Sequence, residues 1–197
     1  MKGVDTRQYI IEKSAALFNK YGYHQCSMND IMIATKLQKG GIYNHFQNKD
    51  EIMLASFDYN FSFVINKFRK RLDKDTNPVQ KIHSVIEVMG NFTTDKNLKN
   101  GCPIFKTGME ALNTHSLLQQ KAREGLEMLK KYIEIKLSEG VQQCLFRHDT
   151  NVSKVAALIL MTLEGGIMMT NITKDQQYIL QATESMKEYI DKNVLIP

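Results

Sequence analysis

The side chains best suited to bind a partner molecule lie between residues 27 and 49 of this chain. Ser27 stands where a helix is expected to begin, and a hydroxyl beside the free amides of a helix start can hold a phosphate. Lys39 and Lys49 add ammonium groups and Tyr43 adds a phenol, all of which bind phosphate oxygens. These residue types indicate binding to a polyanion.

The distribution of charge supports this interpretation. Residues 1–72 contain 11 Lys and Arg against 6 Asp and Glu, whereas residues 73–197 contain 15 of each. The whole net charge of +5 therefore lies in the first part of the chain. A compact basic segment beside a neutral one is typical of a polyanion-binding head on a body with another task. A solvated basic face without a partner would give the same charge count.

A second kind of chemistry comes from Cys102, which lies between Gly101 and Pro103 at an expected helix N-terminus. The partial positive charge there favours a thiolate, and Lys99 and Lys106 lie close in sequence. The pattern fits a reactive thiol. A buried structural thiol fits the same pattern.

Other chemistries find little support. The sequence contains no phosphate-binding loop, nucleophile elbow or HExxH motif, so we expect no enzyme and no cofactor. Cys144 and His148 are at i,i+4 spacing, and Cys102 and His115 could join them as metal ligands. These residues span a loop break and lack a paired motif, so we expect no metal site. A metal-responsive sensor that uses Cys102, Cys144 and His148 is the alternative.

The cysteine count and the apolar runs indicate a compartment. Cysteines that are odd in number and widely spaced do not form a disulfide scaffold and suit a reducing cytoplasm. Residues 1–5 contain no apolar segment typical of an export signal. The longest apolar run, residues 155–169, is too short to span a bilayer and contains Glu164. We therefore expect a cytoplasmic protein that does not bind a membrane.

The elements that position the polar residues are expected to be helices. Of 197 residues, 43% are apolar, 24% are charged and only 3 are proline, which suits one or two all-helical domains. Ser27 and Asp30 have the spacing of a capping box, and Ile42 and Phe46 are expected to point into a core. Apolar periodicity and capping residues predict the first four helices at residues 5–21, 27–35, 38–45 and 48–72. Two short helices with a tight turn between them, braced by longer helices, form a helix-turn-helix.

The rest of the chain is also expected to be helical, which makes about nine helices in all. Residues 152–169 are apolar on every side of a helix, so they must be buried on every side. We expect a dimer joined mainly through residues 152–169 and 175–192. Replacing Leu160 or Ile167 with Glu should break this dimer and DNA binding together. A central core helix in a monomer is the alternative. Helix starts are expected at Pro78, Pro103, Thr114, either Thr150 or Asn151, and Asp175.

Residues 27–52 resemble the helix-turn-helix of the TetR family of bacterial transcription regulators. The family writes the end of this region roughly as Gly-Val-Ser-Lys-Gly-x-Leu-Tyr-x-His-Phe-x-x-Lys-Glu-x-Leu, and residues 36–52 here read KLQKGGIYNHFQNKDEI. The match extends back through residues 10–23, whereas the C-terminal half fits the family only in architecture.

The resemblance implies an all-α fold in two parts. The N-terminal part, residues 1–48, is a three-helix helix-turn-helix domain that binds double-stranded DNA. Residues 49–197 form a helical effector-binding and dimerisation domain, in which residues 49–72 are the linking helix.

The resemblance also implies roles for single residues in the head. Lys39 can reach a base edge or a phosphate, and Gly40 and Gly41 keep the surface low enough for the helix to enter the major groove. Asn44 and His45 can each read a base or touch a phosphate. The implied DNA contacts are Ser27, Met28, Lys36, Gln38, Lys39, Gly40, Gly41, Tyr43, Asn44, His45 and Lys49.

One position departs from the family pattern. The family usually has Gly in the turn where this chain has Lys36. A left-handed backbone costs a non-glycine residue roughly 1–2 kcal/mol. We expect a tolerated turn with an exposed lysine.

Family members use the C-terminal helices to bind a small molecule that shifts the dimer between DNA-competent and incompetent spacings. Methionine adapts to irregular ligands, although each candidate residue here would also fit plain core packing. Some family members sense electrophiles or oxidants through a cysteine, and the start of the Cys102 helix looks similar. The candidate effector pocket consists of Met89, Phe92, Cys102, Phe105, Met109, Met128, Tyr132, Met161 and Met168.

These implications add up to a cytoplasmic, homodimeric transcription regulator. Repression that a small-molecule effector or an electrophile relieves is the habit of the family. A helical adaptor protein that does not bind DNA is the alternative from another class, and it predicts no salt-dependent binding to duplex DNA.

Overall fold

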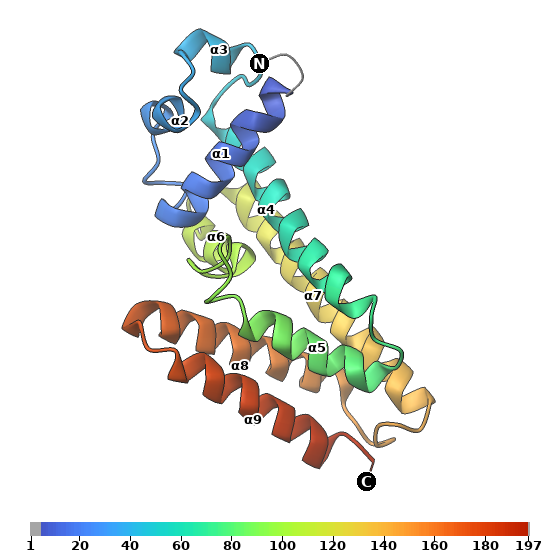
Figure 1. Cartoon of the computed structure of the whole chain (residues 1–197). Coiled ribbons are helices and arrows are strands. Elements are labelled where there is room, and N and C mark those ends of the chain that lie inside the picture. The colour runs from blue at the N-terminus through green and yellow to red at the C-terminus, as the bar shows by residue number, and fades with distance from the viewer. Residues whose placement is uncertain (1–4, 197) are drawn as a thin grey trace. The chain divides into compact units, whose positions relative to one another are not determined.

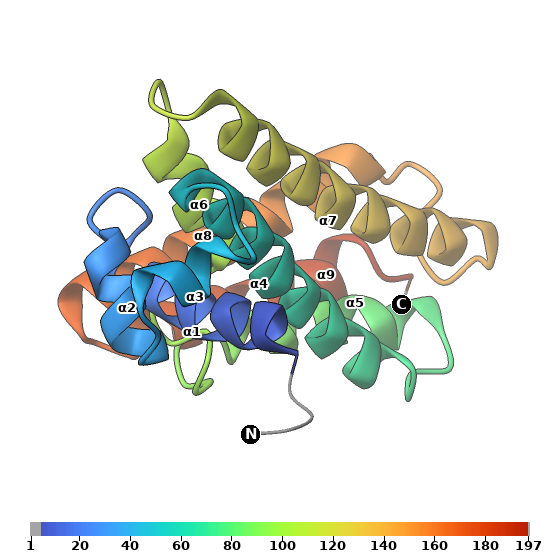
Figure 2. The same ribbon diagram turned by 90° about the horizontal axis from the view of Figure 1, so that it is seen from above.

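The structure, a computed structural model, describes residues 5–196. This part of the chain forms nine α-helices and no strand, which confirms the predicted all-helical class (Figures 1 and 2). Residues 1–4, in which we expect no export signal, lie outside the described residues, as does residue 197. The helices are α1 (Thr6–Tyr21), α2 (Met28–Thr35), α3 (Lys39–Tyr43), α4 (Lys49–Leu72), α5 (Pro78–Gly90), α6 (Pro103–Ala111), α7 (Ser116–Gln142), α8 (Val152–Thr173) and α9 (Gln177–Asn193).

Contacts divide the chain into two compact units. The first consists of the chain up to Val64 together with Pro103–Arg123. The second consists of Ile65–Cys102 and the chain from Glu124 onward. The predicted boundary after residue 48 separates a DNA-binding domain from an effector-binding domain. A division by contacts does not test this separation of functions, so the boundary stays a prediction.

The first unit is built around the apolar faces of α1, α2, α3 and the start of α4. Phe18, Ile31 and Ile42 are fully buried there, and Phe46 joins the same cluster. The Tyr23 ring stacks on Phe18 with 4.8 Å between the ring centroids. The predicted inward direction of Ile42 and Phe46 is therefore confirmed.

Local hydrogen bonds begin and end the two short helices. The Asp30 amide donates to the Ser27 hydroxyl and the Ser27 amide donates to the Asp30 carboxylate, which confirms the predicted capping box. Lys36 ends α2 in the left-handed region with φ of 58° and an exposed side chain. The expected turn with an exposed lysine is therefore present.

In the first unit, α6 holds the end of α1. The Lys106 ammonium donates 2.7 Å to the carbonyl of Asn19, one of the carbonyls that the last turn of α1 leaves unpaired. The Glu110 carboxylate accepts 2.7 Å from the Tyr23 amide. Gly22, with φ of 93°, leaves room for that carboxylate, because a Cβ at Gly22 would lie 2.6 Å from Glu110 Oε1. We refer to Lys106 and Glu110 as the α6 clasp.

One predicted helix cap is wrong. The His115 side chain, and not Thr114, accepts the free amide of Leu118 at the start of α7, at 3.1 Å. The Thr114 hydroxyl instead donates to the Glu110 carbonyl and lies 2.8 Å from His24 Nε2. The expected cap of α4 at Asn48 and the expected start of α5 at Pro78 are confirmed, and of the two candidates for α8 the cap is Asn151.

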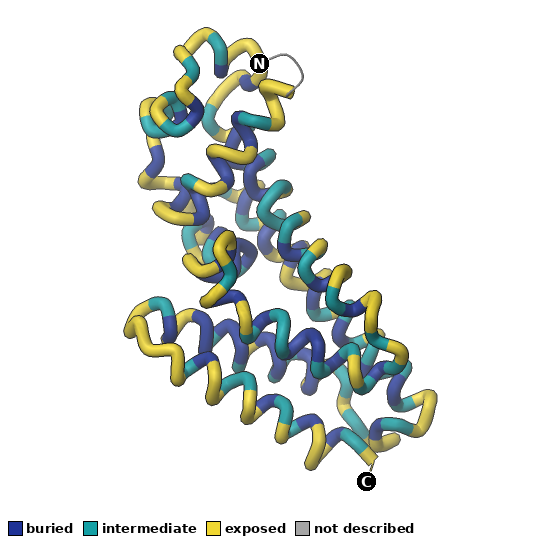
Figure 3. Tube along the Cα trace, viewed as in Figure 1, coloured by how far each residue is buried: buried dark blue, intermediate teal, exposed yellow. Residues whose placement is uncertain are grey.

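In the second unit, α5, α8 and α9 pack together, with α8 buried on one face only (Figure 3). Leu163 and Ile167 are 0% and 2% exposed, whereas Met161, Met168 and Ile172 are 65%, 47% and 74% exposed. The helix α8 is therefore apolar on all sides, as expected, and one apolar side is exposed to solvent in the single chain.

Leu160 and Ile167, where a Glu is predicted to break the dimer, do not lie on the open face of α8. Leu160 is 6% exposed and Ile167 is 2% exposed, so both side chains lie in the interior of their own unit. Successive residues of an α-helix are rotated by about 100° about its axis. The exposed face of α8 therefore contains the next residues along the chain, Met161 and Met168.

The length of α8 exceeds the apolar run that the sequence indicates. The helix has 22 residues and an 18-residue window with mean hydropathy of 1.6, so length and composition alone would allow it to cross a membrane. Half of that window is buried inside the protein, as in the core helix of a soluble protein.

Candidate DNA-binding surface and ligand cavity

The polar residues predicted to contact DNA gather on the exposed side of α3. Lys39, Tyr43, Asn44 and His45 all have exposed side chains. The Lys39 ammonium lies 5.6 Å from the centroid of the Tyr43 ring, so an ammonium and a phenol lie side by side one helical turn apart. Such a pair offers two donors to phosphate oxygens on one face.

Contacts from α1 support this surface from behind. The Tyr9 hydroxyl donates 3.2 Å to the carbonyl of Thr35, in the last turn of α2. The Arg7 guanidinium lies 4.9 Å from the centroid of the Phe46 ring, just after α3. The Thr35 hydroxyl donates 2.7 Å to the Ile31 carbonyl and accepts from the Leu37 amide. The turn between the short helices is therefore anchored on both sides.

The glycines of α3 have no packing role inside the protein. A Cβ at Gly40 would meet no atom within 4 Å, and a Cβ at Gly41 would meet only Leu37 at 3.8 Å. Glycine inside a helix costs roughly 0.5–1 kcal/mol relative to alanine, so the fold alone gives no reason for two of them. A partner that approaches the backbone closely would give one.

The other predicted contact residues differ in accessibility. Lys36 and Gln38 are exposed, whereas Met28 and Lys49 are half-buried. The Ser27 hydroxyl donates 2.6 Å to the Asp30 carboxylate, and this bond with Ser27 lowers the pKa of Asp30. A phosphate contact at Ser27 therefore requires the hydroxyl to exchange its partner.

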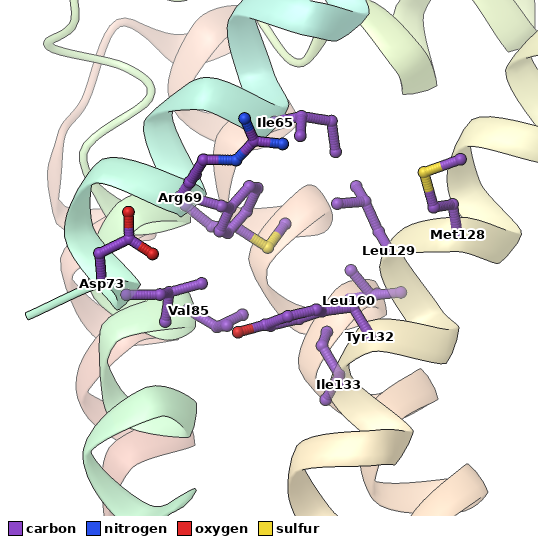
Figure 4. Close-up of a pocket in the computed structure, with 12 residues that line it drawn as sticks. Ile65, Arg69, Asp73, Val85, Met128, Leu129, Tyr132, Ile133 and Leu160 are labelled. Atoms are coloured by element: carbon purple, nitrogen blue, oxygen red, sulfur yellow. The ribbon is translucent and has the colours of Figure 1, made fainter. Parts of the chain in front are cut away.

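The second unit contains a cavity of about 290 Å³ between α4, α5, α7 and α8 (Figure 4). Its volume is close to the lower end of the range for small-molecule sites. The walls are mostly apolar, and they consist of Ile65, Phe68, Arg69, Leu72, Asp73, Val85, Met89, Met128, Leu129, Tyr132, Ile133 and Leu160.

Polar groups in the cavity wall come from three residues. Arg69 and Asp73 extend from the α4 side, and the Tyr132 ring reaches across from α7 with its hydroxyl pointing toward that side (Figure 4). Burial raises the pKa of Tyr132, and the nearby carboxylates of Glu139, Asp75 and Asp73 add to this shift. The cavity thus has an apolar body and one polar side.

The predicted effector pocket is only partly the cavity that the structure contains. Met89, Met128 and Tyr132 line it. Phe92 is buried in the second unit outside the cavity wall, and Met161 and Met168 lie on the exposed face of α8. Phe105 and Met109 belong to the first unit, where Met109 is 57% exposed.

Sequence reasoning missed most of the wall, including Ile65, Arg69, Asp73, Val85 and Leu160. The helical stripe on residues 48–72 contains Ile65, Phe68 and Leu72, but it gives no sign that they face a cavity rather than a filled core. The sequence did offer one sign of a cavity here. Arg69 and Asp73 are charged, and they lie one helical turn apart beside this apolar stripe.

Cys102 is buried rather than accessible, which contradicts its predicted place in the effector pocket. Only 3% of its surface is exposed, and its thiol is hydrogen-bonded to the carboxyl group of Glu164 on α8. Burial raises the pKa of Glu164 to about 7, an effect that the bond with Cys102 opposes. This environment differs from the accessible, electropositive surroundings of reactive cysteines.

The alternative metal site is not assembled. Cys144 is exposed and Cys102 is buried. Among residues 5–196, no group of three or more His, Cys, Asp or Glu residues is placed to hold a metal ion.

Comparisons with known proteins agree on one family. The model of the bacterial regulatory proteins of the tetR family matches residues 10–56, and that of the tetracyclin repressor-like C-terminal domain matches residues 78–186. A TetR transcriptional regulator from Chloroflexus aurantiacus is 31% identical with a TM-score of 0.93, over 98% of this chain and 97% of that one. A TetR-family regulator from Cytophaga hutchinsonii is 31% identical with a TM-score of 0.89 over the whole of both chains. The HTH-type regulator YxaF of Bacillus subtilis is 24% identical, over 95% of this chain and 96% of its own.

Proposed function

Because the chain belongs to the TetR family of bacterial transcription regulators, we propose that it is a cytoplasmic repressor that a small molecule releases from operator DNA. The family consists of DNA-binding regulators and not of enzymes, which removes the helical adaptor as an alternative.

The exposed side of α3 is the surface proposed to enter the major groove. Its position supports Lys39, Gly40, Gly41, Asn44 and His45 as residues near base edges. The proposed contacts to the DNA backbone are Ser27, Met28, Lys36, Gln38, Tyr43 and Lys49.

A homodimer through α8 and α9 would cover the open apolar face of α8. Met161, Met168, Met169 and Ile172 are all exposed on that helix, and Leu180 is exposed on α9. The four α8 residues recur at helical spacing and so form one stripe. Two copies related by a two-fold axis would bury the same stripe on both subunits.

The apolar cavity carries the proposal of ligand control. A cavity of about 290 Å³ with apolar walls and a few polar groups at one side is the usual form of a small-molecule site. An empty space of this kind costs stability, and a bound ligand would offset that cost. A ligand there would contact α4, the helix that begins directly after the proposed DNA-binding residues.

The test begins with DNA. Duplexes that the purified protein retains from a random pool are sequenced, and fluorescence anisotropy then measures affinity for the selected duplex against a scrambled one. Compounds are next screened for release of the selected duplex. Equal affinity for both duplexes over a range of salt concentrations would reject a sequence-specific repressor, and a screen without any release would reject ligand control.

The structure favours a reversible ligand over an electrophile, since Cys102 is 3% exposed. An electrophile such as N-ethylmaleimide is therefore expected to leave the selected duplex bound, with Cys144 as the exposed cysteine that reacts. Release that the variant Cys102→Ser abolishes and Cys144→Ser does not would instead assign the electrophile-sensing role to Cys102.

A further inference from the structure

We propose that the cavity of the second unit takes an uncharged amphiphile, a small molecule with an apolar chain and one hydroxyl or primary amide group. The inference rests on the proposed function, because it names the class of ligand for the cavity to which that function assigns control. Two observations carry it: the apolar walls, and the opposite charges of Arg69 and Asp73 on one side of the cavity.

Apolar side chains from all four helices select the body of the ligand. Phe68 and Leu72 of α4 face the cavity together with Leu129 and Ile133 of α7 and Leu160 of α8. Each of these side chains is almost fully buried, so the wall is dry and gains from contact with an apolar chain.

Arg69 and Asp73 bring opposite charges to the same side of the cavity. They lie one helical turn apart at the end of α4, and both are exposed. Among the described residues neither side chain forms an ion pair or a side-chain hydrogen bond. Both groups are therefore available to a ligand, and their charges sum to zero.

The other carboxylates near the Tyr132 hydroxyl have cationic partners of their own. Asp75 pairs with Arg71 at 2.7 Å, and Glu139 pairs with Lys136. The Lys136 ammonium also lies 5.7 Å from the centroid of the Tyr132 ring. Arg69 and Asp73 are the two charged residues that line the cavity, so its wall carries no net charge to compensate a charged head group.

A charged head group that enters the cavity loses hydration, and a wall without net charge does not repay that loss. A hydroxyl or a primary amide loses less, and it matches both rim groups at once. Its oxygen can accept from the Arg69 guanidinium, which only donates, and its O–H or N–H can donate to the Asp73 carboxylate, which only accepts.

The experiment compares probes that share one chain and differ in the head group. Isothermal titration calorimetry on the full-length protein without DNA uses octanol, octanamide, octanoate and octyltrimethylammonium. We expect octanol and octanamide to bind about tenfold or more tightly than either charged probe. Tighter binding of octanoate or of the ammonium probe, or no binding of any probe, would overturn the proposed ligand class.

Two variants test the role of the opposite charges. Asp73→Asn leaves the Arg69 charge alone, so octanoate should gain about tenfold relative to octanol. Arg69→Gln leaves the Asp73 charge alone, so octyltrimethylammonium should gain by a similar factor. Lys70→Gln, which removes an exposed neighbouring cation outside the cavity wall, should leave the order of the probes unchanged.

Circular dichroism confirms that each variant is folded before titration. If neither Asp73→Asn nor Arg69→Gln changes the order of the probes, the two residues do not select the head group and the inference is wrong. Release of the selected duplex is measured separately. Octanol that binds without releasing DNA would contradict the proposed ligand control while leaving the ligand class intact.

Discussion

The two functional regions of this protein are built in opposite ways. The proposed DNA-binding surface comes from neighbouring residues between Ser27 and Lys49, it is mostly exposed, and its side chains contribute little to the core. The cavity comes from four helices, and its wall residues are also core residues of their unit. Substitutions on that surface should therefore weaken DNA binding without lowering stability, whereas substitutions of buried residues around the cavity and in α8 should change function and stability together.

The largest expected effect tests the two sides of α8. Ile167→Glu places an unpaired carboxylate among buried side chains and should lower the free energy of unfolding by about 3–5 kcal/mol. Met168→Glu, one residue along and 47% exposed, should leave the chain folded but monomeric. Urea unfolding and sedimentation velocity measure the two effects. An unchanged free energy of unfolding for Ile167→Glu, or a dimeric Met168→Glu protein, would contradict this assignment of the faces.

The next effect concerns the buried carboxyl group of Glu164. Its pKa is raised from 4.5 to about 7 in the folded protein, so between these pH values the folded state holds a proton that the unfolded state has lost. The free energy of unfolding should therefore fall as pH rises through this window, by about 3 kcal/mol in total, and this contribution should be flat above it.

Urea unfolding of Glu164→Gln at a series of pH values checks this expectation. The variant should lack that decrease and should be the more stable protein above pH 7. Glu184→Gln, which changes an exposed carboxylate of the same unit, is the matched control and should follow the parent. Parallel curves for the parent and Glu164→Gln would show that Glu164 is ionised in the folded protein throughout.

A smaller effect should appear on DNA binding alone. Lys49→Ala should lower the affinity for duplex DNA about tenfold and reduce the slope of log affinity against log salt by about 1 per subunit. Tyr43→Phe should weaken binding without changing that slope, since a phenol is neutral and releases no counterion. Anisotropy titrations at several salt concentrations measure both, with Lys131→Ala in the second unit as the control. An unchanged slope for Lys49→Ala would remove Lys49 from the DNA backbone contacts.

The smallest expected change has opposite signs for stability and for binding. Gly40→Ala should raise the free energy of unfolding by about 0.5–1 kcal/mol, because the added methyl group meets no neighbouring atom and glycine weakens helices. The same methyl group should weaken binding to the selected duplex by keeping α3 from the base edges. Thermal unfolding and anisotropy test the two signs, and tighter DNA binding by Gly40→Ala would show that the glycine has no role in close approach.

Features set by local chemistry could be predicted from the sequence. The capping box of Ser27 and Asp30 and the left-handed Lys36 depend on residues within a few positions of each other. The cap of α7 was predicted wrongly because a contact distant in sequence decides it: Thr114 lies against His24, which leaves His115 to accept the Leu118 amide.

The cavity depends on how helices pack, and no short-range pattern reports that. Met89, Met128 and Tyr132 could be predicted because large, adaptable side chains on core faces often meet in such spaces. Phe105 and Met109 have the same residue types, but α6 packs with the helix-turn-helix, so they belong to the other unit. Residue type alone cannot make that distinction.

The α6 clasp has a consequence for anyone who would build chimeric regulators. The simplest exchange of DNA-binding heads between two such proteins would cut the chain once, near the end of the helix-turn-helix. Here that cut would place Lys106 and Glu110 of one parent against the end of α1 of the other parent. The hydrogen bonds to the Asn19 carbonyl and from the Tyr23 amide would then join residues of two different proteins. A functional transplant from this protein should therefore carry two segments, the N-terminal residues up to Val64 and the distant stretch Pro103–Arg123.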